Sequence, residues 1–255
     1  MTVNPLLRAL VEREVKNRFL GGVLSPIWWL AQPLLSLGVY ALVFGLFMRA
    51  PVPAQYGDGY VAFLAVGLWP WLAFAESVTR GASSLIAQAS LITKTALPRA
   101  FVPLSTVLVT FALNWLALTV IVILFAALGF KVNLSGILFS LPAWFALFFA
   151  ALGFAWIVST AQILVRDIEG ILGPLFMLLS FVCGIQYGVE SIPAAYRDAV
   201  MANPFTHLIA RMHDTYLAGA GASWVDAMLL AGGAAIALIG HAFFRRVAPH
   251  VDDYL

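Results

Sequence analysis

Charged residues are scarce in this sequence. Asp, Glu, Lys and Arg together make up 10% of the 255 residues, whereas hydrophobic residues make up 62%. A soluble globular domain is about 25% charged and about 45–50% apolar. The shortage of charge therefore excludes an ordinary soluble enzyme and a disordered chain, and a lipid bilayer is the natural solvent for this composition.

Cysteine and net charge are also low. The chain has one cysteine, Cys183, so no disulfide can form within it and a secreted disulfide scaffold is excluded. We expect Cys183 to be a small apolar filler. The net charge of +2 falls short of the concentrated basic face that nucleic-acid binding needs, so we expect no nucleic-acid partner.

The chain lacks the short motifs of common catalytic and metal sites. It has no His-Glu-x-x-His motif and no Gly-x-Ser-x-Gly turn, and the spacing of His207 and His213 is not one at which a helix would let them share a metal. We expect no catalytic residue and no metal site. It also has no Gly-rich loop that cradles phosphates, so if the protein uses ATP, another polypeptide binds it.

One remote alternative is that this chain is itself an enzyme. The run from Gly81 to Ser84, with His241 as a distant base, has the residue types of an intramembrane serine hydrolase. Ser83 and Ser84, however, fall where a short helix would begin at the membrane edge, and helix capping explains them better.

Six segments are apolar enough to be spanning helices, which need about 20 mostly apolar residues. The predicted spans are 27–48, 60–79, 101–128, 137–165, 171–187 and 224–244, of which the fifth is the shortest. Their few charges lie near span ends, and Glu76 and Arg80 are predicted to pair at an i, i+4 spacing. No series of carboxylates crosses the bilayer centre, which argues against a proton- or sodium-coupled transporter.

The basic residues are unevenly distributed between the spans. Six spans place both chain ends on one side, and if those ends are cytoplasmic, ten Lys and Arg lie inside and four outside. The positive-inside rule requires such a bias, so we predict cytoplasmic N- and C-termini. The inner set is Arg8, Arg13, Lys16, Arg18, Arg80, Lys94, Arg99, Arg166, Arg245 and Arg246, and the outer set is Arg49, Lys131, Arg197 and Arg211.

Residues 4–20 predict an amphipathic helix before the first span. Apolar residues recur every four positions from Val3 to Phe19, and the opposite face is basic, with Glu14 and Arg18 at the spacing of a pair within the helix. A helix of this kind suits the membrane interface, although a surface helix packed on the bundle has the same pattern.

Residues 84–95 predict a second short amphipathic helix, between the second and third spans. It can dock into a groove on a soluble partner or serve only as an interfacial connector. The residues we expect at a docking surface are Leu85, Gln88, Ile92, Thr93 and Lys94.

Residues 191–217 predict two half-helices before the last span, separated at Asn203-Pro204. Such a pair can dip into the membrane where protein or a watery cavity surrounds it, and would then form an outer gate; a surface lid is the alternative. The predicted gate residues are Pro193, Tyr196, Asn203 and Pro204.

Aromatic residues also occur inside the first two spans. Tyr40 and Phe44 lie one helical turn apart, and Trp69 and Trp71 flank a proline in the middle of the second span. Aromatic rings pack against sugar rings through apolar and C–H contacts, so these four residues are candidates for the lining of a substrate path. Packing inside the bundle or against lipid is the alternative for each.

In this order, the segments 18–33, 81–99, 165–168, 191–193 and 203–206 resemble the membrane subunit of type-2 ABC exporters. The likeness spans nearly the whole chain and is greatest to the branch that exports O-antigen, teichoic-acid and capsular polysaccharides. It implies an all-α polytopic permease of the bacterial inner membrane, and an exporter of drugs or lipids on the same scaffold is the alternative.

The resemblance also implies partners and sites. It implies a homodimer with two copies of a separate ATPase, which binds ATP and Mg, a coupling helix at 84–95, and a lipid-linked glycan that passes between the protomers. Arg18, Arg99 and Arg166 could then meet the diphosphate headgroup, because arginine fits phosphate well. For each of them, orienting the chain in the membrane is the alternative role.

Overall fold

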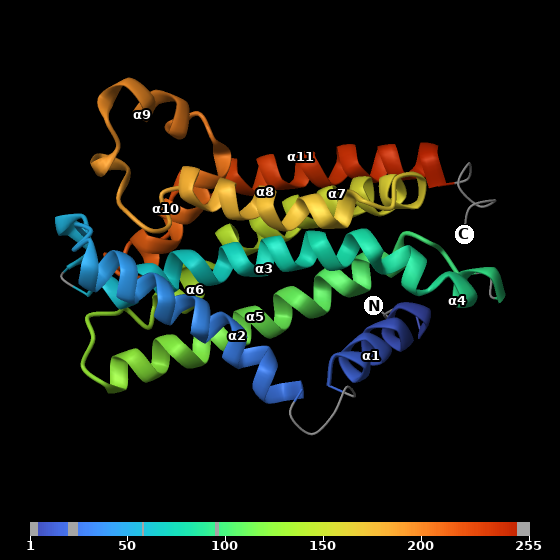
Figure 1. Ribbon diagram of the computed structural model, residues 1–255, viewed down its shortest axis with the longest axis horizontal. Coiled ribbons are helices and arrows are strands. Elements are labelled where there is room, and N and C mark those ends of the chain that lie inside the picture. The colour runs from blue at the N-terminus through green and yellow to red at the C-terminus, as the bar shows by residue number, and fades with distance from the viewer. Residues whose placement is uncertain (1–4, 20–24, 58, 95–96, 249–255) are drawn as a thin grey trace.

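The computed structural model describes residues 5–19, 25–57, 59–94 and 97–248. All regular elements in these ranges are helical, which confirms the all-α fold class (Figure 1). Five helical segments are long and apolar enough to cross a membrane, namely Trp28–Phe47, Tyr60–Ala87, Phe101–Ala127, Gly136–Leu164 and Trp224–Val247. The chain is therefore a multi-pass membrane protein.

The long segments correspond to the following elements. The first is α2 (Ser25–Tyr40), which continues as the π-helix η1 (Ala41–Phe47). The others are α3 (Tyr60–Ala87), α5 (Phe101–Ala127), α6 (Gly136–Phe139) with α7 (Leu141–Leu164), and α11 (Trp224–Val247). α3 runs on past Thr79, where its span was expected to end.

The expected fifth span is a shorter helix, α8 (Ile168–Val182). Its 15 residues rise about 22 Å, less than the roughly 30 Å of the hydrocarbon core. The chain turns soon after the helix, at Gly184, where φ is +69°. Only glycine adopts this conformation readily, so the helix ends before residue 187.

The two ends of the bundle carry different short elements (Figure 1). One end, which we call the α4 end, has α1 (Pro5–Phe19), α4 (Ala89–Lys94) and the last turns of α11. The other, the α9 end, has η2 (Ala54–Tyr56), η3 (Val189–Ser191), α9 (Ala194–Met201) and α10 (Pro204–Tyr216).

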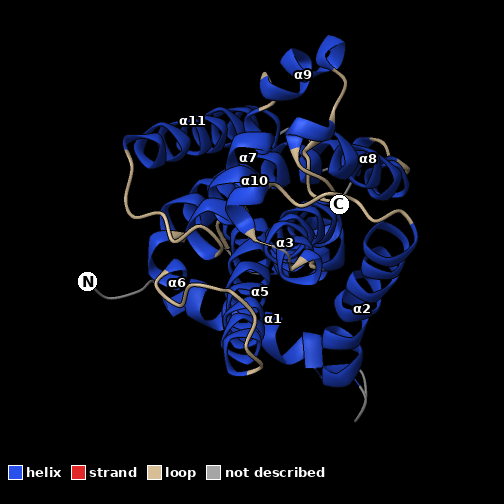
Figure 2. Cartoon of the chain, turned by 90° about the vertical axis from the view of Figure 1, so that its left-hand side faces the viewer, coloured by secondary structure: helices blue, strands red, loops and turns tan. Residues whose placement is uncertain are grey.

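α3 is the central helix of the bundle. Seen from the α9 end, it lies in the middle of the other helices (Figure 2), and it packs against α2, α5, α7, α8 and α10. In its most apolar stretch 78% of the residues are buried, compared with 6% in the first span. The first span therefore rests on the outside of the bundle, where lipid or another protein must cover it.

α7 and α11 pack closely through small residues. A Cβ atom built at Gly240 would lie 2.2 Å from the backbone oxygen of Gly153, and one at Gly233 would lie 2.3 Å from that of Ala146. Small residues let membrane helices approach until their backbones are in van der Waals contact. A Cβ atom at Gly232 would meet nothing within 4 Å, so that face of α11 is free of the constraint.

Replacing Gly240 by alanine is expected to destabilise the protein, whereas the same change at Gly232 is expected to stabilise it slightly. At Gly240 the new methyl group meets the backbone of α7, and overpacking of this kind costs about 1–3 kcal/mol. At Gly232 only the helix propensity changes, by about 1 kcal/mol in favour of alanine. Thermal unfolding of the purified variants in detergent measures the difference, and shifts of the same sign would contradict the close packing.

Candidate functional site

A polar groove runs between α2 and α8, with α3 behind it. Two adjoining cavities of about 350 Å³ and 570 Å³ form this α2–α8 groove and share part of their lining. Polar residues in a spanning segment are costly unless they face protein or a watery cavity, so their gathering here marks the candidate functional site. The polar lining residues are Gln32, Ser36, Tyr40, Glu76, Thr79, Arg80 and Ser180.

Two of the four predicted path aromatics line this groove. Tyr40 is part of its wall and lies 6.1 Å from Phe44, measured between ring centroids, and both rings contact Phe181. Trp71 reaches the groove from α3, and its indole N–H donates to the carbonyl of Phe176 at 3.2 Å. Phe44 is packed beside Tyr40 without lining either cavity.

Trp69 is fully buried and lines neither cavity of the groove. Residues two positions apart on a helix do not share a face, so Trp69 and Trp71 cannot both point into it. Trp69 therefore packs in the core of the protomer and does not line the groove, which was the alternative role for this residue.

Four charged residues join α1 to α3 beside the groove. Arg18 pairs with Glu76, and Arg80 pairs with Glu14 at 2.9 Å. We call this set the α1 clamp. Its partners lie one turn apart on each helix and in opposite order, so the clamp is a two-rung ladder between helices. The sequence predicted that Glu14 would pair with Arg18 and Glu76 with Arg80, each within one helix, and the structure instead pairs them between helices. Residues at an i, i+4 spacing lie on the same face of a helix, so they can pair with each other or with two residues of a neighbouring helix.

Arg18 was predicted to contact a diphosphate headgroup, but in the clamp it is bound to groups of its own chain. Its side chain is 4% exposed, and besides Glu76 it donates to the hydroxyl of Thr110 at 3.1 Å. The amide of Asn114 donates to the second oxygen of Glu76 at 3.1 Å. Arg18 is thus a buried member of a polar network, because a cation at this depth needs protein partners; its terminal nitrogens are hydrogen-bonded and its Nε is not.

Arg99 and Arg166 lie in two further, separate surroundings. Arg99, at the start of α5, donates to the carbonyl of Ala248 at 3.0 Å, beyond α11. Arg166 is exposed in the turn between α7 and α8, whose shape is held by Gln162, which donates to the carbonyl of Arg166 at 2.7 Å. The structure therefore does not bring the three predicted headgroup arginines together.

The predicted coupling helix at 84–95 is divided between two helices. Ser83 and Ser84 do not cap it, because α3 continues through them to Ala87, and the Ser84 hydroxyl donates to the carbonyl of Gly81 at 2.7 Å. Of the predicted coupling segment, only Ala89–Lys94 forms a separate helix, α4, which follows the end of α3. Of the two serines in the hydrolase alternative, Ser84 is buried within α3 and Ser83 is half-buried on the same helix.

The docking residues divide into a buried and an exposed group. Leu85, Gln88 and Ile92 are buried against the bundle, whereas Thr93 and Lys94 are exposed at the end of α4. An apolar stripe on a helix indicates what the helix packs against but not whether this belongs to the same chain. The surface open to a partner is therefore the polar side of α4.

The predicted gate residues lie at the α9 end. Asn203 caps α10, its side chain accepting a hydrogen bond from the backbone N–H of Phe205 at 3.1 Å, and Pro204 occupies the first helical position. Pro193 precedes α9, on which Tyr196 is exposed. Of the two predicted half-helices, α10 packs among the long helices, whereas α9 stands away from them (Figure 1).

α10 is fixed in place by a buried ion pair and a stacked histidine. Arg211 donates through two nitrogens to the carboxylate of Asp226 at the start of α11, at 2.6 and 2.7 Å. The ring of His213 stacks on Phe63 of α3, with centroids 4.1 Å apart, and a ring nitrogen lies 3.0 Å from the Phe63 carbonyl oxygen. His213 and Phe63, together with Tyr56, line a cavity of about 310 Å³.

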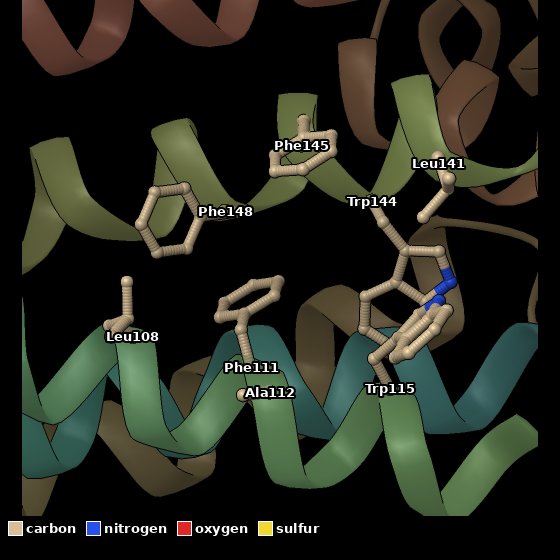
Figure 3. Close-up of a pocket in the computed structure, with 8 residues that line it drawn as sticks. All are labelled: Leu108, Phe111, Ala112, Trp115, Leu141, Trp144, Phe145 and Phe148. Atoms are coloured by element: carbon tan, nitrogen blue, oxygen red, sulfur yellow. The ribbon is translucent and has the colours of Figure 1, made fainter. Parts of the chain in front are cut away.

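A second groove, between α5 and α7, is apolar (Figure 3). Its volume is about 400 Å³, and its lining residues are Leu108, Phe111, Ala112, Trp115, Leu141, Trp144, Phe145 and Phe148. These residues contain no carboxylate, guanidinium or hydroxyl group. This groove suits a lipid chain, whereas the α2–α8 groove has the polar groups that a sugar or phosphate requires.

Acid is expected to destabilise the protein through His213. Burial lowers the pKa of His213 to about 4, whereas an unfolded histidine has a pKa of about 6.5. The unfolded chain thus binds the extra proton, and stability falls as the pH drops from about 6.5 towards 4, by on the order of 3 kcal/mol. His213→Phe should flatten the pH dependence of thermal unfolding in this range. His207→Gln, which leaves His213 in place, is the control, and an unchanged slope in His213→Phe would contradict the assignment.

Residues 5–217 match the family described as ABC-2 type transporter. The chain is similar to two Klebsiella pneumoniae proteins named O-antigen export system permease protein RfbA, at 29% and 30% identity over 98% of this chain and 95% of each relative. It is 31% identical to a Myxococcus xanthus protein of the same name, over 80% of this chain and 77% of the relative. It is 23% identical to the polysialic acid transport protein KpsM of Escherichia coli, over 94% and 92% of the two chains. Because the family match over residues 5–217 covers most of its length, the chain belongs to the ABC-2 type transporter family.

Proposed function

We propose that this chain is the permease subunit of an ATP-driven exporter that moves a lipid-linked polysaccharide, of the O-antigen or capsule type, across the bacterial inner membrane. The observation that carries the proposal is the α2–α8 groove, which gathers polar and aromatic side chains inside otherwise apolar spanning segments. The names of the relatives, which are export permeases and a polysialic acid transport protein, support the substrate class.

In this proposal the functional unit is a homodimer. The first span is barely covered by its own chain, yet it carries the exposed Gln32 among exposed apolar residues. Lipid is a poor neighbour for an amide, and a second copy placed against α2 and α8 would close the groove into a channel. The lipid-linked glycan would then pass between the two protomers.

Energy would come from two copies of a separate ATPase that binds ATP and Mg. This chain has no phosphate-binding Gly-rich loop. We place the α4 end in the cytoplasm, because ten of the fourteen basic residues then lie on the cytoplasmic side. The exposed side of α4, with Thr93 and Lys94, faces the ATPase.

The proposal is tested by removing the chain from cells that display a surface polysaccharide. We expect the surface polysaccharide to disappear and its lipid-linked precursor to accumulate inside, and we expect an ATPase to co-purify with the tagged chain. The chain returned in trans should restore the surface polysaccharide. An unchanged surface polysaccharide, together with no co-purifying ATPase, would rule the proposal out.

Reversing the charge of Lys94 is expected to weaken the docking of the ATPase on this chain. Lys94 is exposed at the end of α4, so Lys94→Glu changes the docking surface without disturbing the core. Polysaccharide export and substrate-stimulated ATP hydrolysis should both fall severalfold in the purified complex. Lys131→Glu, at an exposed lysine of the α9 end, is the matched control and should leave both rates as in the wild type. Equal rates in the two variants would contradict the placement of α4 on the ATPase.

A further inference from the structure

Arg80 is the only basic side chain among the described residues that line the α2–α8 groove. Its side chain is 39% exposed, whereas that of its partner Glu14 is 8% exposed. One terminal nitrogen donates to Glu14 at 2.9 Å, and Nε is buried without a hydrogen-bond partner. Since a guanidinium has five N–H donors in a planar fork, Arg80 keeps donors for a further acceptor.

The other charged residue of the groove does not neutralise Arg80. Both carboxylate oxygens of Glu76 are already engaged, one by Arg18 and the other by the amide of Asn114. The groove therefore contains a carboxylate whose two oxygens are both engaged and a guanidinium whose charge is matched by Glu14 but whose hydrogen-bond donors are only partly used. An anion with several acceptor oxygens is the ligand that complements this arrangement.

The surroundings of Arg80 indicate that this anion carries an apolar chain. The helices that flank the groove expose large apolar side chains, among them Leu35 and Val39 on α2 and Met177 and Leu178 on α8. Lipid tails are well accommodated against such surfaces, whereas a free inorganic ion gains nothing from them. The fitting class is a lipid with a phosphate or diphosphate head.

We propose that the α2–α8 groove binds the diphosphate head of a lipid-linked substrate through Arg80, and that Glu14 is the internal anion that holds Arg80 while the groove is empty. A phospholipid phosphate carries one negative charge, the same as Glu14, so exchanging one for the other brings no electrostatic gain. A diphosphate carries at least two negative charges and offers a bidentate geometry, so it displaces Glu14 from Arg80. The identity of the lipid as a glycan carrier rests on the proposed function.

The test measures binding of fluorescent undecaprenyl diphosphate to the full chain in nanodiscs of phosphatidylcholine. Arg80→Gln should weaken binding about tenfold or more, the loss expected for charge-assisted hydrogen bonds, and Arg80→Lys should lie between Gln and wild type. Glu14→Gln should strengthen binding severalfold, because the internal competitor is gone.

The opposite signs separate ligand binding from a structural role. Arg80→Gln and Glu14→Gln break the same ion pair, so a purely structural clamp would make both variants bind more weakly and unfold at lower temperature. Arg13→Gln removes an exposed arginine of α1 that lies outside the groove and should bind as the wild type does. The proposal would be overturned if Arg80→Gln bound the fluorescent lipid as tightly as Arg13→Gln does, or if Glu14→Gln bound it more weakly than the wild type.

Two further arms identify the source of the phosphate. Nanodiscs doped with phosphatidylglycerol should leave binding of the diphosphate unchanged, and competition at equal concentration would assign the groove to ordinary phospholipid and overturn the carrier assignment. The assay needs neither an ATPase nor a glycan. A negative result here therefore leaves the export experiment intact, and a failed export experiment leaves the binding result standing.

Discussion

Hydrocarbon cannot hydrogen-bond or solvate a charge, and the buried charges of this chain are arranged to meet that constraint. At the α4 end, Arg18 is shared between Glu76 and Thr110, and Arg80 is held by Glu14. At the α9 end, Arg211 is held by Asp226 through two hydrogen bonds. Each pair joins two helices, so the pairing of charges also holds the short helices α1 and α10 against the long ones.

The central position of α3 links these charged contacts to one another. α3 carries Glu76 and Arg80 in the groove and the clamp, leads directly into α4 at one end, and supports His213 through Phe63 near the other. α3 is continuous from Tyr60 to Ala87, although Pro70 removes one of its backbone hydrogen bonds between the groove and Phe63. One helix therefore contacts the coupling surface, the groove and the cavity beside α9.

The sequence was sufficient for features that depend on local composition. Runs of apolar residues located the spanning helices, and Asn203-Pro204 located the break before α10, because hydropathy and capping act within a few residues. Pairing between elements was not accessible in this way. Glu14 and Arg18 satisfy the rule for a pair on one helix as well as they satisfy a ladder with Glu76 and Arg80, and Leu85 shows the same periodicity whether it faces this chain or a partner.

The same ambiguity explains why the sequence favoured Arg18 as a cation for an anionic substrate, although the geometry favours Arg80. Counting charges cannot show which member of a network is buried, and the network of Glu14, Arg18, Glu76 and Arg80 is neutral as a whole. Both arginines keep an Nε without a hydrogen-bond partner, and what distinguishes Arg80 is that it lines the groove and is 39% exposed, whereas Arg18 is 4% exposed. A neutral network can remain in the membrane while the groove is empty, since no charge is left alone. It can accept a ligand only where one of its cations is accessible, and that condition is met at Arg80.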